Sequence, residues 1–250
     1  MKCYDLHTHT THSDGHACVN ELVEIAKKKG YGLGISDHLF CETLNTPDKI
    51  TAYLDDLSKY PVLKGCEANI GEDYSLPDSL TSRFDYIIAS VHHVIDFNGQ
   101  FTHFGNYFGE RAQDFPKVLW DNPFQMDKSE RYLTELLPVI EHTMKTQRMD
   151  IYGHCTVLPF YEKLIDTSFL TDWENEIISL CKKYKIAMEI SGLWKEPGEN
   201  MIRRAKDAGL KFTFGSDCHI RKDICNIDYA LEMAKKVNLT EKDILQISLS

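Results

Sequence analysis

Short apolar runs alternate along the chain with longer stretches in which apolar residues recur every three or four positions. The runs predict strands at residues 3–7, 31–36, 60–67, 84–91, 149–153, 186–190 and 211–215. The amphipathic stretches predict helices at residues 20–29, 47–57, 127–147, 172–184, 199–208, 227–237 and 241–247. Residues 84–91 are almost continuously apolar, which is typical of a parallel strand that is covered on both faces.

Residues that favour helix ends or bends refine this map. Gly30 follows the first predicted helix and is a typical helix terminator, and Pro47 suits the first turn of the second helix. Thr171 or Asp172 is expected to cap the helix at 172–184. Pro138 lies inside the helix at 127–147, where a kink is expected because proline cannot donate a backbone hydrogen bond.

The order of the predicted elements indicates the fold class. Most of the seven predicted strands are separated by a helix, which implies an α/β protein with a parallel sheet. Seven such units within 250 residues favour a closed barrel in a single domain spanning residues 1–250. Residues 95–125 are rich in Phe, Gly, Asn and Asp and show weak periodicity, so we expect a long functional loop or lid there.

Charge and composition narrow the range of functions. The formal net charge is −10, and such an acidic chain is a poor candidate for non-specific binding to nucleic acid or to a membrane. An anionic substrate can still bind locally where metal ions invert the field. Hydrophobic residues make up 42% and charged residues 26% of the chain, as in an ordinary globular protein.

Cysteine usage and the N-terminal sequence suggest a compartment. The eight cysteines are scattered and form no Cys-x-x-Cys pair, so reduced buried thiols are expected. The start of the chain has no basic segment followed by an apolar stretch, as a signal peptide would, and no apolar run reaches about 18 residues. We therefore expect a cytoplasmic enzyme.

Histidines and acidic residues gather where the predicted strands end. Because the carboxyl ends of the strands of a (β/α) barrel meet at one mouth, these side chains are expected to lie together. A lone histidine after a strand is usually a capping or surface residue, and His103 and His142 are assigned to that class, while His93 is interpreted as a neighbour of a ligand. The remaining candidates at or near strand ends are His7, His9, Asp37, His38, Glu67, His92, His154, Glu189, Asp217 and His219.

His7 and His9 form a His-x-His pair on a predicted extended segment. Residues two apart on such a segment point to the same side, so the two imidazoles can hold one ion. Imidazole and carboxylate together suit Zn²⁺, Mn²⁺ or Fe²⁺. The spacing alone indicates no more than a possible metal site.

Several segments together resemble the PHP (polymerase and histidinol phosphatase) superfamily. They are DLHTHT at 5–10 with SDG at 13–15, ISDH at 35–38, GCE at 65–67, SVH at 90–92, GH at 153–154 and GSDCH at 215–219. The resemblance covers nearly the whole chain in the right order and is closest to the histidinol-phosphate phosphatase branch. It implies a distorted (β/α)7 barrel, in agreement with the seven units above.

The resemblance also implies a site for two to three divalent metal ions (Zn, Mn or Fe). The ligands implied for the first ion are His7, His9, Glu67 and Asp217, and those for the second are Glu67, His92 and His154. The third ion would bind His38, His219 and either Asp14 or His16; Asp14 is favoured because the spacing of His16 is one residue too long. His12 is interpreted as a bystander.

The implied activity is hydrolysis of a small phosphomonoester by attack of a metal-bridging hydroxide. Asp217 or His219 is expected to assist proton transfer, and Arg221 and Lys195 are candidate substrate contacts. Residues 190–195 are shorter than the pattern of that branch, so the substrate stays open. The alternatives are a phosphodiesterase or nucleotidase on the same site, a C–N hydrolase of the amidohydrolase type, or a non-catalytic metal-binding module.

Overall fold

The computed structural model describes residues 3–95, 101–104 and 125–247. Its main strands are parallel and fall into two sheets, with order β1-β2-β3 and β10-β9-β8-β5-β4. The strands are β1 (Tyr4–Asp5), β2 (Gly32–Ile35), β3 (Leu63–Lys64), β4 (Glu67–Asn69), β5 (Ile88–Ser90), β8 (Ile151–Tyr152), β9 (Ala187–Ser191) and β10 (Phe212–Gly215).

Backbone hydrogen bonds join the two sheets into a closed, distorted barrel. The strand predicted at 60–67 is present but broken into β3 and β4, and Glu67 N–H of β4 donates to Asp37 O (3.1 Å) just after β2. On the other side β1 and β10 meet, where Leu6 N–H donates to Phe214 O (2.9 Å). Within the described residues the ring therefore has seven strand positions, and the predicted (β/α)7 barrel is confirmed.

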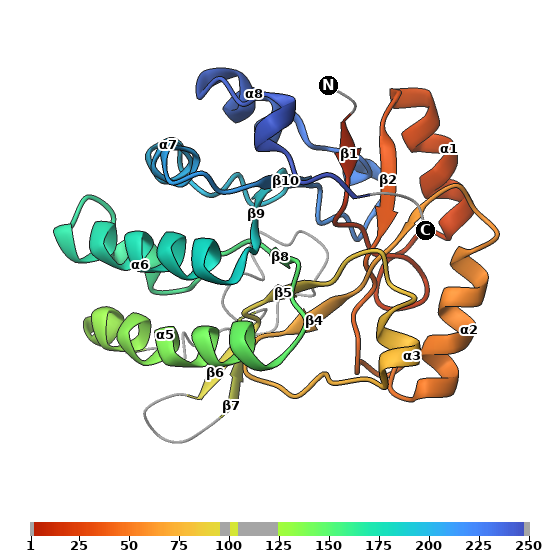
Figure 1. Cartoon of the computed structure of the whole chain (residues 1–250), viewed down its shortest axis with the longest axis horizontal. Helices are drawn as coiled ribbons and strands as arrows, with labels where there is room; N and C mark the ends of the chain where they lie inside the picture. Colours follow the sequence, from red (N-terminus) through yellow and green to blue (C-terminus); the bar gives the residue numbers. More distant parts are fainter. Residues whose placement is uncertain (1–2, 96–100, 105–124, 248–250) are drawn as a thin grey trace.

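The helices surround this barrel (Figure 1). They are α1 (Val19–Lys29), α2 (Pro47–Leu57), α3 (Asp78–Thr81), α5 (Ser129–Thr146), α6 (Ser168–Tyr184), α7 (Glu199–Asp207) and α8 (Asp228–Lys236). Helix α5 continues through Pro138. Helix α6 begins earlier than predicted: Thr167, rather than Thr171 or Asp172, is its N-cap, which extends the helix to the buried Leu170.

The prediction of a helix at 241–247 is wrong. A single 3₁₀ turn (Glu241–Asp243) is followed by extended chain, and Leu245 N–H donates to Phe212 O (2.9 Å) beside β10. The apolar side chains of Leu245 and Ile247 pack against the barrel core, which favours an extended conformation over an isolated helical turn. These residues close the end of the barrel opposite to the carboxyl ends of the strands.

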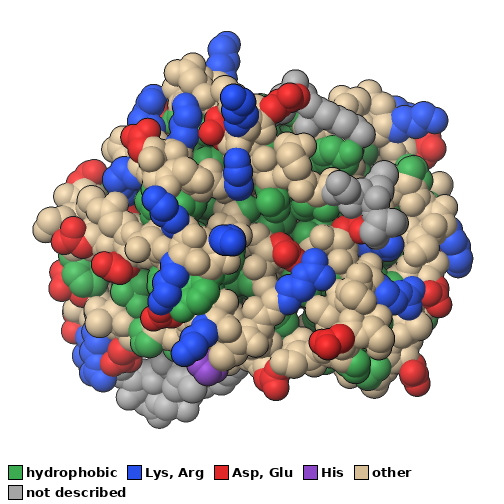
Figure 2. All heavy atoms as spheres, in the orientation of Figure 1, with side chains coloured by type: hydrophobic (Ala, Val, Ile, Leu, Met, Phe, Trp, Pro, Cys, Tyr) green, Lys and Arg blue, Asp and Glu red, His purple; other side chains and the backbone are tan. Residues whose placement is uncertain are grey.

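The segment predicted as a long loop contains a short antiparallel hairpin of β6 (His93–Ile95) and β7 (Phe101–His103). The remainder of the predicted lid, residues 96–100 and 105–124, lies outside the described residues. Figure 2 shows acidic and basic side chains interspersed over the face it presents. No described helix is long and apolar enough to cross a membrane.

Apolar side chains fill the half of the barrel at the amino ends of its strands. Leu6, Leu63, Tyr86, Ile88 and Ile151 form a buried cluster there. The hydroxyl of Tyr86 donates to the carbonyl of Leu6 (2.5 Å), so this polar group is satisfied inside the core. Because the amino-end half of the barrel is packed, polar side chains at its carboxyl end have a rigid floor.

Candidate metal centre

Imidazoles and carboxylates converge at the carboxyl end of the barrel. In the described part of the chain, three overlapping groups have ligand atoms within 4.8 Å of one another: His7, His9 and Asp217; His38, Glu67 and His92; and His9, Asp14, His38 and His219. His154 adjoins the second group through Glu67. The structure thus brings together all the side chains predicted as metal ligands except His16.

The first group lies deepest in the barrel. The Nε2 atom of His7 is 3.2 Å from Glu67 Oε2 and 3.5 Å from Asp217 Oδ1. The Nε2 atom of His9 is 3.5 Å from the same Glu67 oxygen and 3.2 Å from the same Asp217 oxygen. Two imidazoles from the segment after β1 therefore face two carboxylate oxygens across one small space.

Glu67 lies between the groups. Its Oε1 atom is 3.2 Å from His154 Nε2 and 3.3 Å from His92 Nε2. Its Oε2 atom faces His7 and His9 and is also 3.1 Å from His38 Nδ1. The two oxygens thus point to different imidazoles, as a bridging ligand requires.

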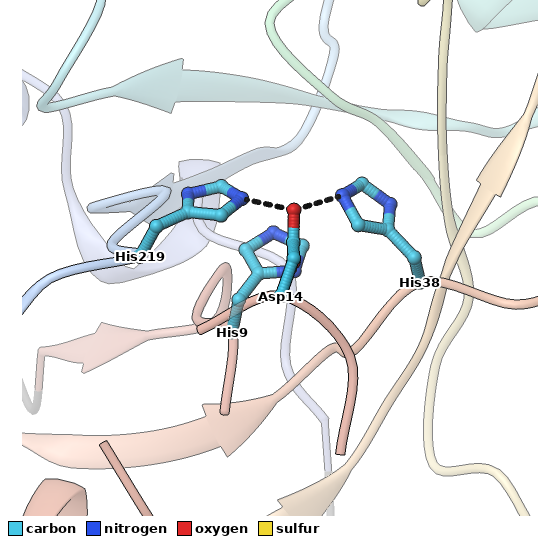
Figure 3. A group of neighbouring side chains, drawn as sticks. All are labelled: His9, Asp14, His38 and His219. Atoms are coloured by element: carbon cyan, nitrogen blue, oxygen red, sulfur yellow. Dashed lines mark ion pairs between the residues drawn. The ribbon is translucent and has the colours of Figure 1, made fainter. Parts of the chain in front are cut away.

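The outermost group is built around Asp14 (Figure 3). Its Oδ2 atom is 3.3 Å from His219 Nε2 and 3.7 Å from His38 Nε2, and its Oδ1 atom is 3.7 Å from His9 Nδ1. His16 is exposed and belongs to none of the three groups. The geometry therefore favours Asp14 for the place that the sequence left open between these two residues.

The loop that carries Asp14 is tied down by Asp37. This buried carboxylate accepts hydrogen bonds from Thr10 N–H (2.7 Å), the Thr10 hydroxyl (2.8 Å) and the Ser13 hydroxyl (2.6 Å). The chain also passes very close to itself at Gly15, where an added Cβ would lie 2.3 Å from His9 O. Asp37, a candidate from its position after a strand, thus has an anchoring role.

Several buried ring nitrogens in this centre have no hydrogen-bond partner among the residues that the structure describes. They include His7 Nε2 and both ring nitrogens of His9. Where the other nitrogen of a ring is engaged, the tautomer follows: Nδ1–H of His7 donates to Glu189 Oε1 (2.8 Å) and Nδ1–H of His92 donates to Asn69 Oδ1 (2.6 Å). The Nε2 atoms remain to bind a metal ion, which displaces any proton that they carry, so the residues present fit divalent cations.

The pKa values of two carboxyl groups in this centre also favour cation binding. Burial acts to raise the pKa of Glu67, but the imidazoles of His7, His92 and His38 outweigh it and hold the pKa well below its usual range. Burial likewise acts to raise the pKa of Asp217, but His7 and other imidazoles lower it well below the usual value. Both carboxyls are therefore ionised at neutral pH, which is the form that binds a cation.

Glu189 is a supporting residue whose role the sequence did not reveal. Besides holding His7, it accepts a hydrogen bond from His154 N–H (2.7 Å), so one carboxylate orients two candidate ligands. Gly215 leaves room for it, because an added Cβ there would lie 2.0 Å from Glu189 Oε1. The available signal was an acidic residue inside a fully buried strand, which requires a partner.

The two candidate substrate contacts are exposed side chains with different surroundings. Lys195 is exposed and lines a cavity of about 640 Å³ next to Trp194. Arg221 is exposed and pairs with Glu21 (Nε to Oε1, 2.9 Å). Neither side chain belongs to the groups of metal-ligand candidates, and their roles stay predictions.

The other histidines have separate contacts. His12 Nε2 is 3.0 Å from Asp56 Oδ2, which agrees with its interpretation as a bystander. His93 Nε2 is 3.6 Å from Glu72 Oε1, and the exposed ring of His103 stacks on His92 with centroids 6.1 Å apart. None of these three residues enters a metal-ligand group within the described part of the chain.

A parallel barrel with imidazoles and carboxylates at its mouth defines a metal-binding α/β-barrel protein. The PHP domain family matches residues 5–192, and the chain belongs to this family. The matched span ends before Asp217 and His219, and the geometry places these two residues with the rest of the site.

Comparisons with individual proteins agree with this assignment. The chain is 25% identical over 272 residues to a probable phosphatase of Aliivibrio fischeri, covering 98% of this chain and 90% of the relative. It is 27% identical over 266 residues to a probable phosphatase of Clostridium acetobutylicum, covering 96% and 88%. Its fold resembles the histidinol phosphate phosphatase of Lactococcus lactis in complex with zinc, L-histidinol and phosphate, with a TM-score of 0.65, 18% identity and coverage of 99% and 97%.

Proposed function

We propose that this protein is a metal-dependent phosphatase that hydrolyses a small phosphomonoester resembling histidinol phosphate. The observation that carries the proposal is the convergence of buried, unpartnered imidazole nitrogens with ionised carboxylates at the mouth of the barrel. The names of the relatives, phosphatases in each case, support the same reaction class.

Two to three divalent ions fit the three overlapping groups of ligand atoms. His7, His9 and Asp217 would hold one of them with Glu67, while His92 and His154 would hold a second with the other Glu67 oxygen. The third set is Asp14, His38 and His219. Imidazole and carboxylate donors are compatible with Zn, Mn or Fe, and the zinc in the Lactococcus structure supports the first of these.

When bound, divalent ions neutralise the phosphate, acidify water and stabilise the leaving oxygen. The protein's own residues place the reacting groups. Glu67 lies between the groups and contacts imidazoles of each with its two oxygens. The Nδ1 atom of His219 lies 3.1 Å from Asp217 O, and its Nε2 atom faces Asp14 in the outer group. His219 is partly exposed and Asp217 nearly buried, so His219 is the better placed of the two to exchange a proton with solvent.

The expected substrate is small and anionic. The net charge of −10 disfavours long nucleic acids, whereas a phosphomonoester needs only the local positive field of the metal site. Lys195 and Arg221 are the candidate cationic contacts to the substrate. Alanine at a true contact should raise KM by about 10-fold with little change in kcat, since it removes binding that is uniform between ground and transition state.

The test is a hydrolysis screen with the purified protein. A generic chromogenic phosphomonoester, a panel of small phosphomonoesters that includes histidinol phosphate, and a chromogenic diester are compared with Mn²⁺, Zn²⁺ and Fe²⁺. The proposal expects metal-dependent release of inorganic phosphate from monoesters. A strong preference for the diester would replace the phosphatase with a phosphodiesterase, and metal binding without turnover of any ester would indicate a non-catalytic metal-binding module.

A further inference from the structure

Trp194 reaches the metal centre from the turn that follows β9. Its indole Nε1–H donates to Asp217 Oδ2 at 2.6 Å, and its ring lies 6.4 Å, centroid to centroid, from the ring of His154. Trp194 also lines the cavity of about 640 Å³ described above. One half-buried side chain thus contacts one candidate metal ligand, lies near a second and borders this cavity.

The turn that carries Trp194 is held at both ends. Ser191 N–H donates to Glu196 O (2.8 Å), and Lys195 N–H donates back to Ser191 O (3.1 Å). The buried Glu196 carboxylate accepts a hydrogen bond from Thr156 N–H (2.9 Å), which fixes the far end of the turn to the segment after β8. The indole is therefore held in place by the backbone as well as by its own contacts.

Because of the hydrogen bond to Trp194, the two oxygens of the Asp217 carboxylate have different partners. Oδ2 accepts the indole N–H, while Oδ1 faces His7 and His9 at 3.5 and 3.2 Å. An indole N–H is only a donor and carries no charge, so it orients an ionised carboxylate without neutralising it. A Lys or Arg in its place would compete with a metal ion for the same charge.

We propose that Trp194 is a positioning residue that presents Asp217 as a one-oxygen metal ligand, and that its indole therefore reports occupation of this site. The inference rests on the metal site of the proposed function. It adds a residue that the ligand motifs do not contain and that contacts a ligand rather than the ion. Outer partners of this kind are generally worth about 10- to 100-fold in metal affinity.

The first experiment compares two matched substitutions. Trp194→Phe keeps an aromatic ring and removes the N–H, and Trp173→Phe makes the same change at a buried indole whose N–H donates to Leu133 O (3.0 Å) away from the site. Mn²⁺ binding to the metal-free proteins is measured by calorimetry, and folding by circular dichroism. Trp194→Phe should weaken the tightest Mn²⁺ site by about 10- to 100-fold, while Trp173→Phe leaves it within about twofold of the original protein.

Equal Mn²⁺ affinity in the original protein and in Trp194→Phe would overturn the role of Trp194 and leave the proposed function intact. Absence of Mn²⁺, Zn²⁺ and Fe²⁺ binding in the original protein would instead overturn the proposed function itself. The two failures are therefore distinguishable in a single titration series.

A second measurement does not depend on the stability of Trp194→Phe. The chain has three tryptophans, so the double substitution Trp120→Phe, Trp173→Phe leaves Trp194 as the single indole. Its emission should change as Mn²⁺ is added and should level off when the tightest site is filled, because the acceptor of its hydrogen bond then shares its charge with the ion. Emission that is unaltered at full occupancy would overturn the inference.

Discussion

The inner and outer parts of the metal centre are built in different ways. The inner side chains His7, His9, Glu67 and Asp217 are at most 6% exposed, whereas those of the outer group, Asp14, His38 and His219, are between 23% and 48% exposed. The inner ligands lie in or just after barrel strands and have supporting contacts from Glu189 and Trp194. The outer carboxylate is carried by a surface loop.

This difference in burial should make the inner part bind its metal ion more tightly and leave the outer part more accessible to solvent and substrate. Buried ligands that are already oriented lose little freedom when an ion binds, so the inner site should hold its ion more tightly. The outer group can exchange its ion and meet substrate more easily, because solvent reaches it. The same centre thus combines a rigid interior with an open edge, and substitutions on each side should have different consequences.

The largest effect is expected from removing the inner imidazoles. The double substitution His7→Ala, His9→Ala should remove one metal equivalent and lower phosphatase activity by about 1000-fold, since lost metal stabilisation of the transition state amounts to several kcal/mol. Metal content by elemental analysis and turnover of a chromogenic ester check this. His12→Ala, at the imidazole paired with Asp56, is the control and should keep both. Retained activity in the double variant would refute the ligand roles.

A smaller and more selective effect is expected at the outer edge. Asp14→Ala should remove the weakest-bound metal equivalent, lowering affinity at that site by at least about 100-fold, while the inner ions remain. His16→Ala, two positions along the same loop, should keep the full metal content because His16 lies outside the ligand groups. Stepwise metal titration distinguishes the two. The reverse result would assign the third site to His16.

The smallest effect on activity is expected at Glu196, where a substitution should mainly change stability. Glu196 is a buried carboxylate that, unlike Glu67, is not surrounded by several imidazoles. Burial raises the pKa of Glu196 to about 7 from a usual value of 4.5, even though hydrogen bonds from Thr156 oppose the shift. Between these values the folded protein binds more protons than the unfolded chain, so this group's contribution to stability is present at low pH and is lost as pH rises through the window.

Glu196→Gln should therefore increase the free energy of unfolding at pH 8 by up to about 3 kcal/mol, and the gain should shrink towards pH 4.5. Denaturant titrations of the metal-free protein at both pH values measure it. Glu24→Gln, at an exposed position of α1, should show no such pH dependence. An effect of equal size at both pH values would contradict the assignment.

The sequence predicted which side chains lie together where chemistry and strand position coincide. His7, His92 and His154 follow apolar runs, and the carboxyl ends of parallel strands must meet, so their proximity required no coordinates. The choice between Asp14 and His16 was harder, because it depends on how the loop after His9 folds back onto Asp37. The family resemblance favoured Asp14, and the geometry places Asp14 rather than His16 beside His38 and His219.

The supporting residues could not be assigned from the sequence because their roles arise from contacts between distant segments. Glu189 meets His7 across 182 positions, and Trp194 meets Asp217 across 23. Local rules also failed where tertiary packing prevailed: residues 241–247 read as a helix, yet Leu245 and Ile247 pack extended against the barrel core. Arg221 is a further example, since nothing in its local sequence predicted its pairing with Glu21.

The pairing of β1 with β10 has a consequence for biosynthesis. Ser216 N–H donates to Asp5 Oδ1 (2.8 Å) across 211 positions, and Asp217 N–H donates to His7 O (2.8 Å) at the same junction. At typical translation rates the ribosome adds the second half of this junction about 10 to 40 s after the first. Throughout that interval the nascent chain carries His7 and His9 without Asp217. Tight metal loading is consequently a late event, completed when the final strand docks beside the first.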